Sequence, residues 1–591
     1  MKSFFSGLLG SCLGVFVAFL VLFLIIIGIG AAGIASKETE KNAHVLKLKL
    51  EDFIPEKSGN VSQDLFFLSG NAEMIGLKRI LELLDAAATD DNIKGIYIEN
   101  NTVNAGQATV LSLIQGLRKF KESGKFIYSY ADAHSQMSYL LCSVADSMFL
   151  NPQGSVDLKG FGATIPFFKN MLDKVGVEMN IFYAGNFKSA TEPFRLTEMS
   201  EFNRLQTREF LRDMYQIMAN ELAQNRGLEP TTIDSIMTHM AGRKAKDALQ
   251  SGLVDVLFYE DQVDDFLKKK LGIDADKKLT YLTLSDYDTT AKVHEDTGGR
   301  DKIAIVHAEG EIMYGVDEPG VISEKNYMTL LTKIRNDKKI KAVVLRVNSP
   351  GGNAFSSDVI WRELERIKEA GKPVIASFGD YAASGGYYIA AGADEIVAQP
   401  NTLTGSIGVF MMFPDATKLL NDKIGVNFDT IKTHEFATGF SPTNKLSEKE
   451  KALLQEMTLE TYDLFVNRVA TGRKLSMDST KVIAQGRVWT GKKALEIGLV
   501  DTLGDLDDAI AIAAKKAGLE KYKIVEYPYI EEDFMATIIR EIQKSQGDEE
   551  DAVRMLAGKE EFKWFNQYRQ FKSIIRCREP HARLPFILSL N

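Results

Sequence analysis

The chain repeats itself at an interval of about 248 residues, and this repeat is the feature that most constrains its fold. The segment Gly124 to Asp132 (GKFIYSYAD) matches Gly371 to Asp380 (GKPVIASFGD) with one residue inserted. The other matches keep the same order in both halves: Asn92–Ile98 with Lys339–Leu345, Ala145–Asp146 with Ala393–Asp394, Pro152 with Pro400, Gly160 with Gly408, Ala248–Leu249 with Ala494–Leu495, and Gly252–Asp255 with Gly498–Asp501. A duplicated domain explains this pattern.

Each half alternates short β-branched runs with helical patterns. The runs typical of buried strands are Ile303–His307, Ala342–Val347, Pro373–Ser377 and Glu395–Ala398. Asp358–Ala370 has helical periodicity, and the capping box of Ser447 and Glu450 begins a predicted helix that continues to about Thr471. Strands and helices in alternation predict an α/β fold in layers.

The domain plan follows from the repeat and from changes in composition. We expect a first repeat over residues 44–283, a linker over 284–299 that is rich in Asp, Thr and Gly, a second repeat over 300–525 and a charged tail over 526–591. Within the tail, aromatic and basic residues from Phe562 to Ile575 fit a docking helix or a contact with a membrane surface.

The amino terminus predicts a membrane anchor over residues 1–36. No charged residue occurs from Ser3 to Ser36, and Leu13–Ala32 is almost wholly apolar, which is long enough for a helix to cross a bilayer. We expect residues 11–33 to lie in lipid. Cleavage at Gly30–Gly33, as in a signal peptide, is the alternative. Counting Lys and Arg would place the large domain inside, but long domains override that count, so the residues leave the orientation open.

Charge and cysteine content exclude several classes of function. The net charge of −9 argues against a nucleic-acid surface, which needs a basic patch. The three cysteines (Cys12, Cys142 and Cys577) can form neither a disulfide framework nor a zinc site of known spacing. We therefore expect no metal and no cofactor.

Two glycine-rich turns in the second half follow predicted strands, at Asn348–Gly352 and Ala383–Gly386. Acyl transfer needs backbone N–H groups aimed at a developing oxyanion, and one such donor contributes about 3–4 kcal/mol. Gly352 and Gly385 are the candidate donors. Each turn taken alone is better explained as a simple strand-to-helix connection.

Comparison of the halves makes the chemical interpretation stronger. Gln136 stands where the second half has Ser384, and Thr102–Ala105 replaces the Ser-Pro-Gly-Gly turn. Conversely, Lys188 stands where the second half has Ala437. One half thus has a serine without this lysine, and the other has the lysine without the serine. This distribution is expected for a pair of catalytic residues divided between duplicated domains.

A serine hydroxyl needs a neighbouring base before it can attack a carbonyl. Lysine serves if burial lowers its pKa from about 10.4 toward 7–8, and an interface between domains would supply that burial. We therefore predict a serine protease with Ser384 as nucleophile and Lys188 as general base. His434, in the segment equivalent to the Lys188 region, is the alternative base.

With these motifs the chain resembles the long, duplicated form of the signal peptide peptidase SppA (protease IV) family over about residues 1–525. The motifs are GNFKSA around Lys188, NSPGG ending at Gly352, AASGGYY around Ser384 and TGSIG around Ser406. The resemblance implies two tandem ClpP/crotonase-like domains and a Ser/Lys dyad. It also implies that Ser406 hydrogen-bonds Lys188 and that Gly352 and Gly385 form the oxyanion hole.

The same resemblance implies hydrolysis of cleaved signal peptides and other apolar peptides. It implies a single anchor in the bacterial inner membrane, an extracytoplasmic catalytic domain and a homo-oligomer, a tetramer in that family. Two other functions fit the fold: a crotonase-type acyl-CoA enzyme and a catalytically inactive membrane scaffold. An α/β-hydrolase is disfavoured because Ala382 interrupts the G-x-S-x-G elbow around Ser384.

Overall fold

The structure is a computed structural model that describes residues 44–60, 74–293, 298–316, 318–529 and 581–583. The predicted anchor at residues 1–36 and the Phe562–Ile575 segment lie outside these residues. In the part of the chain that is described, no helix combines the length and apolar character needed to cross a membrane.

The first repeat is built on a six-stranded sheet with the order β6-β4-β3-β2-β1-β7. Its strands are β1 (His44–Leu48), β2 (Ile93–Glu99), β3 (Phe126–His134), β4 (Ser147–Val156), β6 (Val256–Leu257) and β7 (Tyr281–Thr283). Its helices are α3 (Leu77–Thr89), α4 (Gln107–Lys121), α5 (Gln136–Cys142), α6 (Lys169–Val175), α7 (Glu192–Arg195), α8 (Glu201–Arg226), α9 (Pro230–His239), α10 (Ala245–Gln250), α11 (Glu260–Leu271) and α12 (Leu284–Thr290).

The second repeat is built on an eight-stranded sheet. The main path is β17-β15-β13-β11-β8-β19, and β14 pairs with β13 and β18. Its strands are β8 (Lys302–Glu309), β11 (Ile340–Ser349), β13 (Val374–Ala383), β14 (Glu395–Ala398), β15 (Leu403–Gly405), β17 (Val488–Thr490), β18 (Thr502–Leu503) and β19 (Lys523–Tyr527). Its helices are α13 (Glu324–Asn336), α14 (Ala354–Glu369), α15 (Gly385–Ala390), α16 (Glu448–Arg473), α17 (Met477–Ile483), α18 (Gly491–Glu496) and α19 (Leu506–Lys516).

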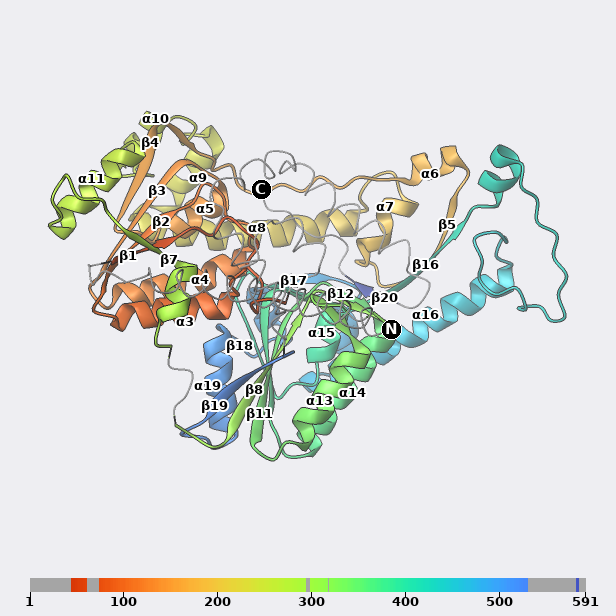
Figure 1. Ribbon diagram of the computed structural model, residues 1–591. Coiled ribbons are helices and arrows are strands. Elements are labelled where there is room, and N and C mark those ends of the chain that lie inside the picture. The colour runs from red at the N-terminus through yellow and green to blue at the C-terminus, as the bar shows by residue number, and fades with distance from the viewer. Residues whose placement is uncertain (1–43, 61–73, 294–297, 317, 530–580, 584–591) are drawn as a thin grey trace, which may run out of the picture. The chain divides into compact units, whose positions relative to one another are not determined.

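Helices cover both faces of the second sheet, as Figure 1 shows for α19 on one side of β8 and β11 and for α13 and α14 on the other. Alternate residues of a strand point to opposite faces. Val343 and Leu345 of β11 accordingly pack with Ile360 of α14, whereas Val344 packs with Ile510 of α19. The strand is buried on both faces, which explains why it reads as a continuous β-branched run rather than an alternating one.

The two repeats share side-chain interactions as well as topology. Tyr139 of α5 donates a hydrogen bond from its hydroxyl to the carbonyl of Leu253, and Tyr387 of α15 donates one to the carbonyl of Leu499, both at 2.8 Å. Equivalent bonds at equivalent places are the structural counterpart of the sequence repeat.

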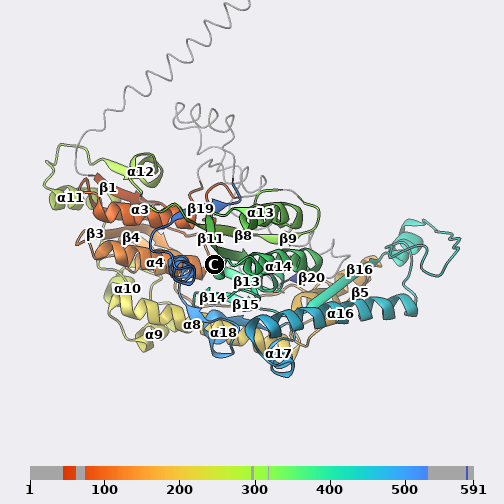
Figure 2. The same ribbon diagram turned by 90° about the horizontal axis from the view of Figure 1, so that it is seen from below.

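A third sheet joins the repeats. Its order is β10-β9-β12-β20-β16-β5, formed by β5 (Glu178–Ala184), β9 (Glu311–Met313), β10 (Val321–Ser323), β12 (Gly351–Asn353), β16 (Val409–Asp415) and β20 (His581–Arg583). Strand β5 comes from the first repeat and pairs antiparallel with β16 of the second along its whole length. Figure 2 shows α16 running beside this β5–β16 ribbon.

The predicted elements of the second repeat are confirmed. Strands form at all four predicted runs, and the capping box of Ser447 and Glu450 begins α16, which ends at Arg473. Helix α14 begins at Ala354, four residues before the predicted Asp358, because the Asn353 side chain caps it by accepting from the N–H of Ser356.

The segment 284–299, which we expected to be a linker, contains a helix in its first half. Leu284–Thr290 forms α12, whose Leu284 and Tyr287 are buried in the core of the first repeat. Thr283 caps this helix, and the Tyr287 hydroxyl donates to Asp90 at 3.2 Å.

Candidate active site

The candidate site is centred on a buried hydrogen bond between side chains of the two repeats. The Nζ atom of Lys188 lies 2.9 Å from the Oγ atom of Ser384, and both residues are fully shielded from solvent. Lys188 follows β5, which leaves the first repeat to pair with β16. Ser384 lies between β13 and α15 of the second repeat. The predicted pair is therefore brought together across 196 residues of sequence.

The backbone at Ser384 adopts a conformation that L-residues rarely use, with φ at +57°. Its N–H donates to the carbonyl of Gly405 at 2.8 Å, and its carbonyl accepts from the N–H of Tyr388 at 2.8 Å. Such conformations cost about 1–3 kcal/mol and persist where the surroundings fix them. The sharp turn from strand to helix directs the hydroxyl toward Lys188.

The environment of Lys188 favours its neutral form. Its amine also donates to the hydroxyl of Ser406 at 3.1 Å and to the Ser406 carbonyl at 3.3 Å, and it lies 6.0 Å from the centre of the Phe410 ring. Burial lowers the pKa of Lys188 well below its ordinary value. A neutral amine can accept the proton of the serine hydroxyl, so this pair can generate a nucleophile.

The two glycine turns lie against each other beside Ser384. Helix α15, which begins at Gly385, contacts β12, which contains Gly352. A side chain at Gly352, where φ is +154°, would come within 2.0 Å of the Ile312 carbonyl oxygen, so only glycine fits. Gly385 directly follows Ser384, and Gly352 lies on a strand that contacts the same helix, so their role as oxyanion donors stays a prediction.

The comparisons with known proteins agree with this geometry. Peptidase family S49 matches residues 119–274 and, a second time, residues 366–520. Protease 4 of Salmonella typhi is 36% identical over 527 residues, which cover 86% of this chain and 84% of that protein. Protease 4 of Haemophilus influenzae is 35% identical over 84% of this chain and 82% of its own.

The chain belongs to peptidase family S49. It is a serine peptidase of the protease IV type, and the two matches confirm that it carries two S49 domains. Among solved structures, ClpP1 from Listeria monocytogenes is similar over 34% of this chain and 92% of its own, with 16% identity and a TM-score of 0.23. At that TM-score the likeness does not bear on the assignment.

Other candidate groups in this S49 peptidase lie away from the serine. His434, the alternative base, is exposed, and its Nδ1 atom lies 3.1 Å from the hydroxyl of Thr433. The buried Cys142 is a free thiol. In the described ranges no three His, Cys, Asp or Glu side chains are grouped so as to hold a metal ion.

The structure adds Gly486, a residue of this site that sequence reasoning missed. A side chain there would come within 2.7 Å of the Cβ atom of Lys188, and φ is +74°. Its N–H donates to the carbonyl of Ile407 at 2.7 Å. The sequence did hold a signal, because the first repeat has Gly242 in the matching Gly-Arg pair.

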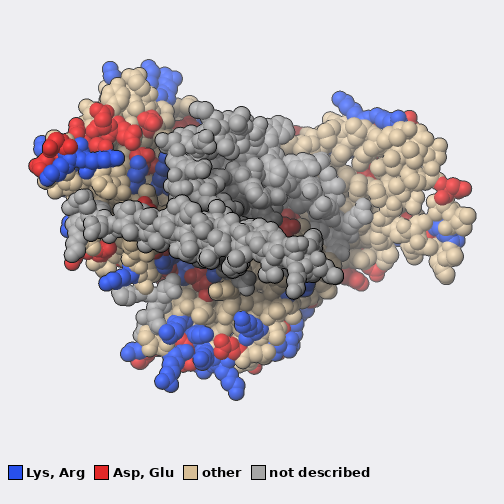
Figure 3. All heavy atoms as spheres, in the orientation of Figure 1, with Lys and Arg blue, Asp and Glu red and all other residues tan. Residues whose placement is uncertain are grey.

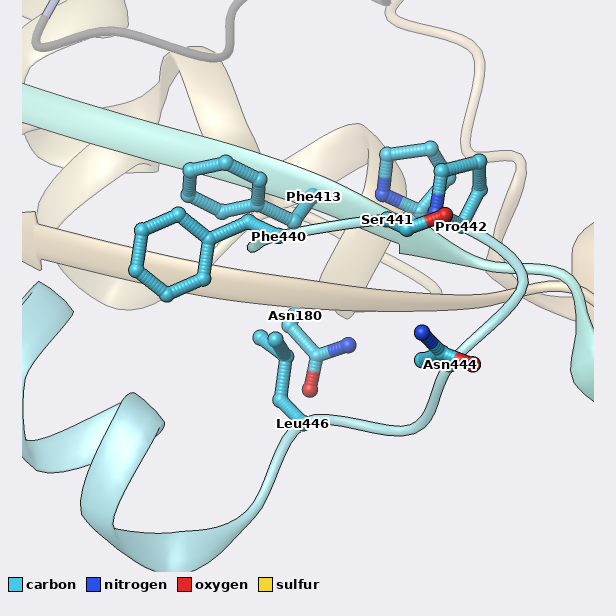
Figure 4. A pocket seen from close by; sticks show the side chains of 8 residues that line it. Asn180, Phe413, Phe440, Ser441, Pro442, Asn444 and Leu446 are labelled. Atoms are coloured by element: carbon cyan, nitrogen blue, oxygen red, sulfur yellow. The ribbon is translucent and has the colours of Figure 1, made fainter. Parts of the chain in front are cut away.

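The crevice in Figure 4 is a different kind of feature. Phe413 of β16, Phe440 and Leu446 line it together with Asn180 of β5, and the centres of the two phenyl rings are 5.5 Å apart. Its volume of about 10 Å³ admits at most one water molecule. The crevice therefore records how the segment 440–446 is anchored on the ribbon, and it is too small for a substrate.

Proposed function

We propose that this peptidase uses a Ser384/Lys188 dyad to hydrolyse apolar peptides, including cleaved signal peptides, at a membrane. The observation that carries the proposal is the 2.9 Å bond between two fully buried groups from different repeats. A buried lysine without a carboxylate partner is costly to fold, and a task that needs a neutral amine explains its presence.

The chemistry follows from the positions of the atoms. Neutral Lys188 accepts the hydroxyl proton as the Ser384 oxygen attacks the peptide carbonyl, and the N–H groups of Gly352 and Gly385 stabilise the oxyanion. The lysine ammonium then gives its proton to the departing amine, leaving an acyl-serine. A water molecule, deprotonated by the same lysine, releases the acid and restores the hydroxyl. The Ser406 oxygens, at 3.1 and 3.3 Å, orient the amine throughout.

The third sheet supports an extended peptide as substrate. Strand β20 of this chain lies between β12 and β16, with Ala582 opposite Gly352 and His581 opposite Phe410. An extended main chain therefore fits beside the oxyanion-hole strand by antiparallel pairing, as peptides do when they add to a sheet. The neighbouring Phe410 and Met412 are buried and apolar. Together these features favour apolar side chains in the substrate.

Two measurements test this proposal. A fluorophosphonate probe should acylate the wild-type protein and leave Ser384→Ala unlabelled. Cleavage mapped by mass spectrometry should be faster on a signal peptide than on a charged peptide of equal length. Equal rates on the two peptides would reject apolar selectivity, and labelling of Ser384→Ala would reject the nucleophile.

For location, the proposal places the chain in the bacterial inner membrane through residues 11–33, with the catalytic part outside the cytoplasm. The support is the apolar run Leu13–Ala32 and the apolar stretch that signal peptides themselves carry. Deletion of residues 1–36 should release the protein from membranes and leave its peptidase activity within about twofold, because the dyad lies far along the chain from these residues. Membrane retention of the shortened chain would contradict the anchor.

A homo-oligomer, with a tetramer as the expected form, completes the proposal. Residues 176–188 leave the first repeat to pair with the second, whereas the equivalent residues 425–437 project from the end of the ribbon (Figure 1). This stretch and its flank expose five large apolar side chains, namely Ile424, Val426, Phe428, Ile431 and Phe436, at an end of the molecule where Figure 3 shows uncharged surface between scattered charged residues. Because the equivalent segment of the first repeat packs against another repeat, we expect this exposed segment to pack against a second copy of the chain.

The oligomer is tested by light scattering after size-exclusion chromatography. We expect Ile431, which is 96% exposed, to be essential for assembly of the oligomer. Ile431→Asp should therefore reduce the measured molecular mass to that of a smaller species. Val482→Asp on α17, where the side chain is 74% exposed, is the matched control and should leave the mass unchanged. A monomeric wild type would overturn this part of the proposal.

A further inference from the structure

We propose that Gln206 is a positioning residue that holds Lys188 in register with Ser384 and keeps water from the amine. The proposal rests on the Ser/Lys dyad proposed above. Gln206 lies early in α8 and is 1% exposed. It neither touches the serine nor belongs to any motif in the sequence.

The side-chain amide of Gln206 clamps both neighbours of Lys188. Its Nε2 atom donates to the carbonyl of Phe187 at 3.0 Å and to the hydroxyl of Ser189 at 2.8 Å. Its Oε1 atom accepts from the N–H of Val488 at 3.2 Å. Both Nε2 donors and the amide oxygen are therefore engaged, and Gln206 connects the turn that carries the lysine to a strand of the other repeat.

That strand pairs with the strand that precedes Ser406, the residue that accepts hydrogen bonds from Lys188. Val488 begins β17, which pairs antiparallel with β15, and its partner in register is Gly405. The next residue is Ser406, whose hydroxyl and carbonyl both accept from Lys188. One amide group therefore sets the distance between the lysine turn and the strand pair on which its acceptors lie.

The start of α8 is itself fixed to the same turn. Ser200 caps the helix, and the buried carboxylate of Glu192 accepts from the Ser200 hydroxyl at 2.6 Å and from the Asn203 amide at 2.9 Å. Glu192 is four residues beyond Lys188. Because the helix start cannot shift independently of this turn, Gln206 is a rigid support.

The turn needs such a support because it has little regular structure of its own. Around Lys188 the chain passes from Gly185 into a single 3-10 turn, and the N–H of Lys188 reaches only the carbonyl of Gly185 at 3.2 Å. A lysine side chain is long and flexible, so its amine stays dry and aligned only if its backbone is held. Loosening the turn admits water, which raises the pKa of Lys188 toward its ordinary value.

The test compares Gln206→Met, which keeps the volume and removes the amide, with Gln399→Met. Gln399 is also 1% exposed and also bridges the repeats, donating to Ser112 at 3.2 Å and Gln115 at 3.1 Å, but it lies outside the lysine turn. The readouts are kcat and KM for an apolar peptide, the pH profile of kcat/KM and the melting temperature.

In Gln206→Met we expect kcat to fall about 10–100-fold with little change in KM, as for a small misplacement of a catalytic group. We also expect the acidic limb of the pH profile to move upward by about half a pH unit or more. Gln399→Met should lower the melting temperature without moving that limb. An unmoved limb in Gln206→Met, with a loss of activity no larger than in Gln399→Met, would overturn the proposal.

Gln206→Glu keeps the test decisive if the methionine variant does not fold. It has the same shape, but its carboxylate opposes the carbonyl of Phe187, so the same shift of the acidic limb is expected. Failure of the dyad can be distinguished from failure of the positioning role. Peptidase activity in Lys188→Met would reject the dyad itself. An inactive Lys188→Met together with wild-type activity and pH profile in Gln206→Glu would reject only the positioning role.

Discussion

The place of Ser384 in the second repeat can be compared with the same place in the first, where Gln136 stands. Gln136 is fully buried, accepts from the N–H of Gly160 at 2.9 Å and donates to the Gly160 carbonyl at 3.2 Å. The glutamine amide is thus hydrogen-bonded through both its nitrogen and its oxygen. The fold survives loss of the nucleophile because packing and hydrogen bonding, not chemistry, hold this position together.

The lysine shows the reverse. Lys188 of the first repeat is fully buried against the second, whereas the matching region of the second repeat lies at the surface, where Phe436 is 46% exposed. Burial is what lowers the pKa of Lys188, so the same residue type at the second position would remain an ordinary charged lysine. The active site needs a serine in one repeat and a buried lysine on a segment that crosses to it from the other repeat. The second repeat supplies the serine, and the first repeat supplies the lysine.

Of the changes that test this comparison, removing either member of the dyad should reduce peptidase activity most. Ser384→Ala and Lys188→Ala should each reduce kcat by about 10³-fold or more, and the double variant should be no worse, because residues that act as a unit are not additive. The measurement is hydrolysis of an apolar fluorogenic peptide, with circular dichroism to confirm folding. Activity within about threefold of wild type in either variant is incompatible with the dyad.

The glycine turn should come next. Gly352→Ala places a methyl group 2.0 Å from the Ile312 carbonyl oxygen, so β12 must shift and the oxyanion donor moves with it. We expect a loss of about 10²–10³-fold in kcat. The matched change is Ala105→Gly at the equivalent place in the first repeat, which should leave kcat unaltered. Equal effects of the two changes would show that the first repeat also takes part in catalysis.

The pH profile should separate the two supports of the lysine. Because burial lowers the pKa of Lys188, kcat/KM should rise with pH through a value below the ordinary one, as the neutral amine forms. Ser406→Ala removes an acceptor that favours the ammonium, so the acidic limb should move to lower pH with about a tenfold loss of kcat. This direction is opposite to that expected for Gln206→Met. A shift of both variants in the same direction would refute the separate roles.

The smallest effect on activity should come from adding a serine to the first repeat. Gln136→Ser in a Ser384→Ala background should remain inactive, since no buried lysine among the described residues faces that position. The change should lower the free energy of unfolding by about 1–3 kcal/mol, because the amide bonds to Gly160 are lost. Denaturant titration and the peptide assay measure the two effects. Any regained hydrolysis would mean that a second base lies near Gln136.

The sequence predicted the scaffold well because its signals are local. The strand at Ala342–Val347 is a β-branched run, and Ser447 and Glu450 form a capping box within four consecutive residues. The helix inside the expected linker was not predicted, because its stability comes from burying Tyr287 in the core of the first repeat. The polar composition of the segment gave no sign of that contact. The dyad was predicted from the comparison of the two halves and from the family motifs around Lys188 and Ser384.

By itself, then, the amino-acid sequence determined that this chain has two α/β repeats, a serine in one, a lysine in the other, and glycine turns beside the serine. Only the tertiary structure decided that Lys188 is buried, that it lies 2.9 Å from Ser384, and that Gln206 and Gly486 hold it there. The physical reason is desolvation: the pKa of a lysine depends on which distant segments exclude water from it. Val488, which fixes Gln206, is 282 residues away from it in the sequence.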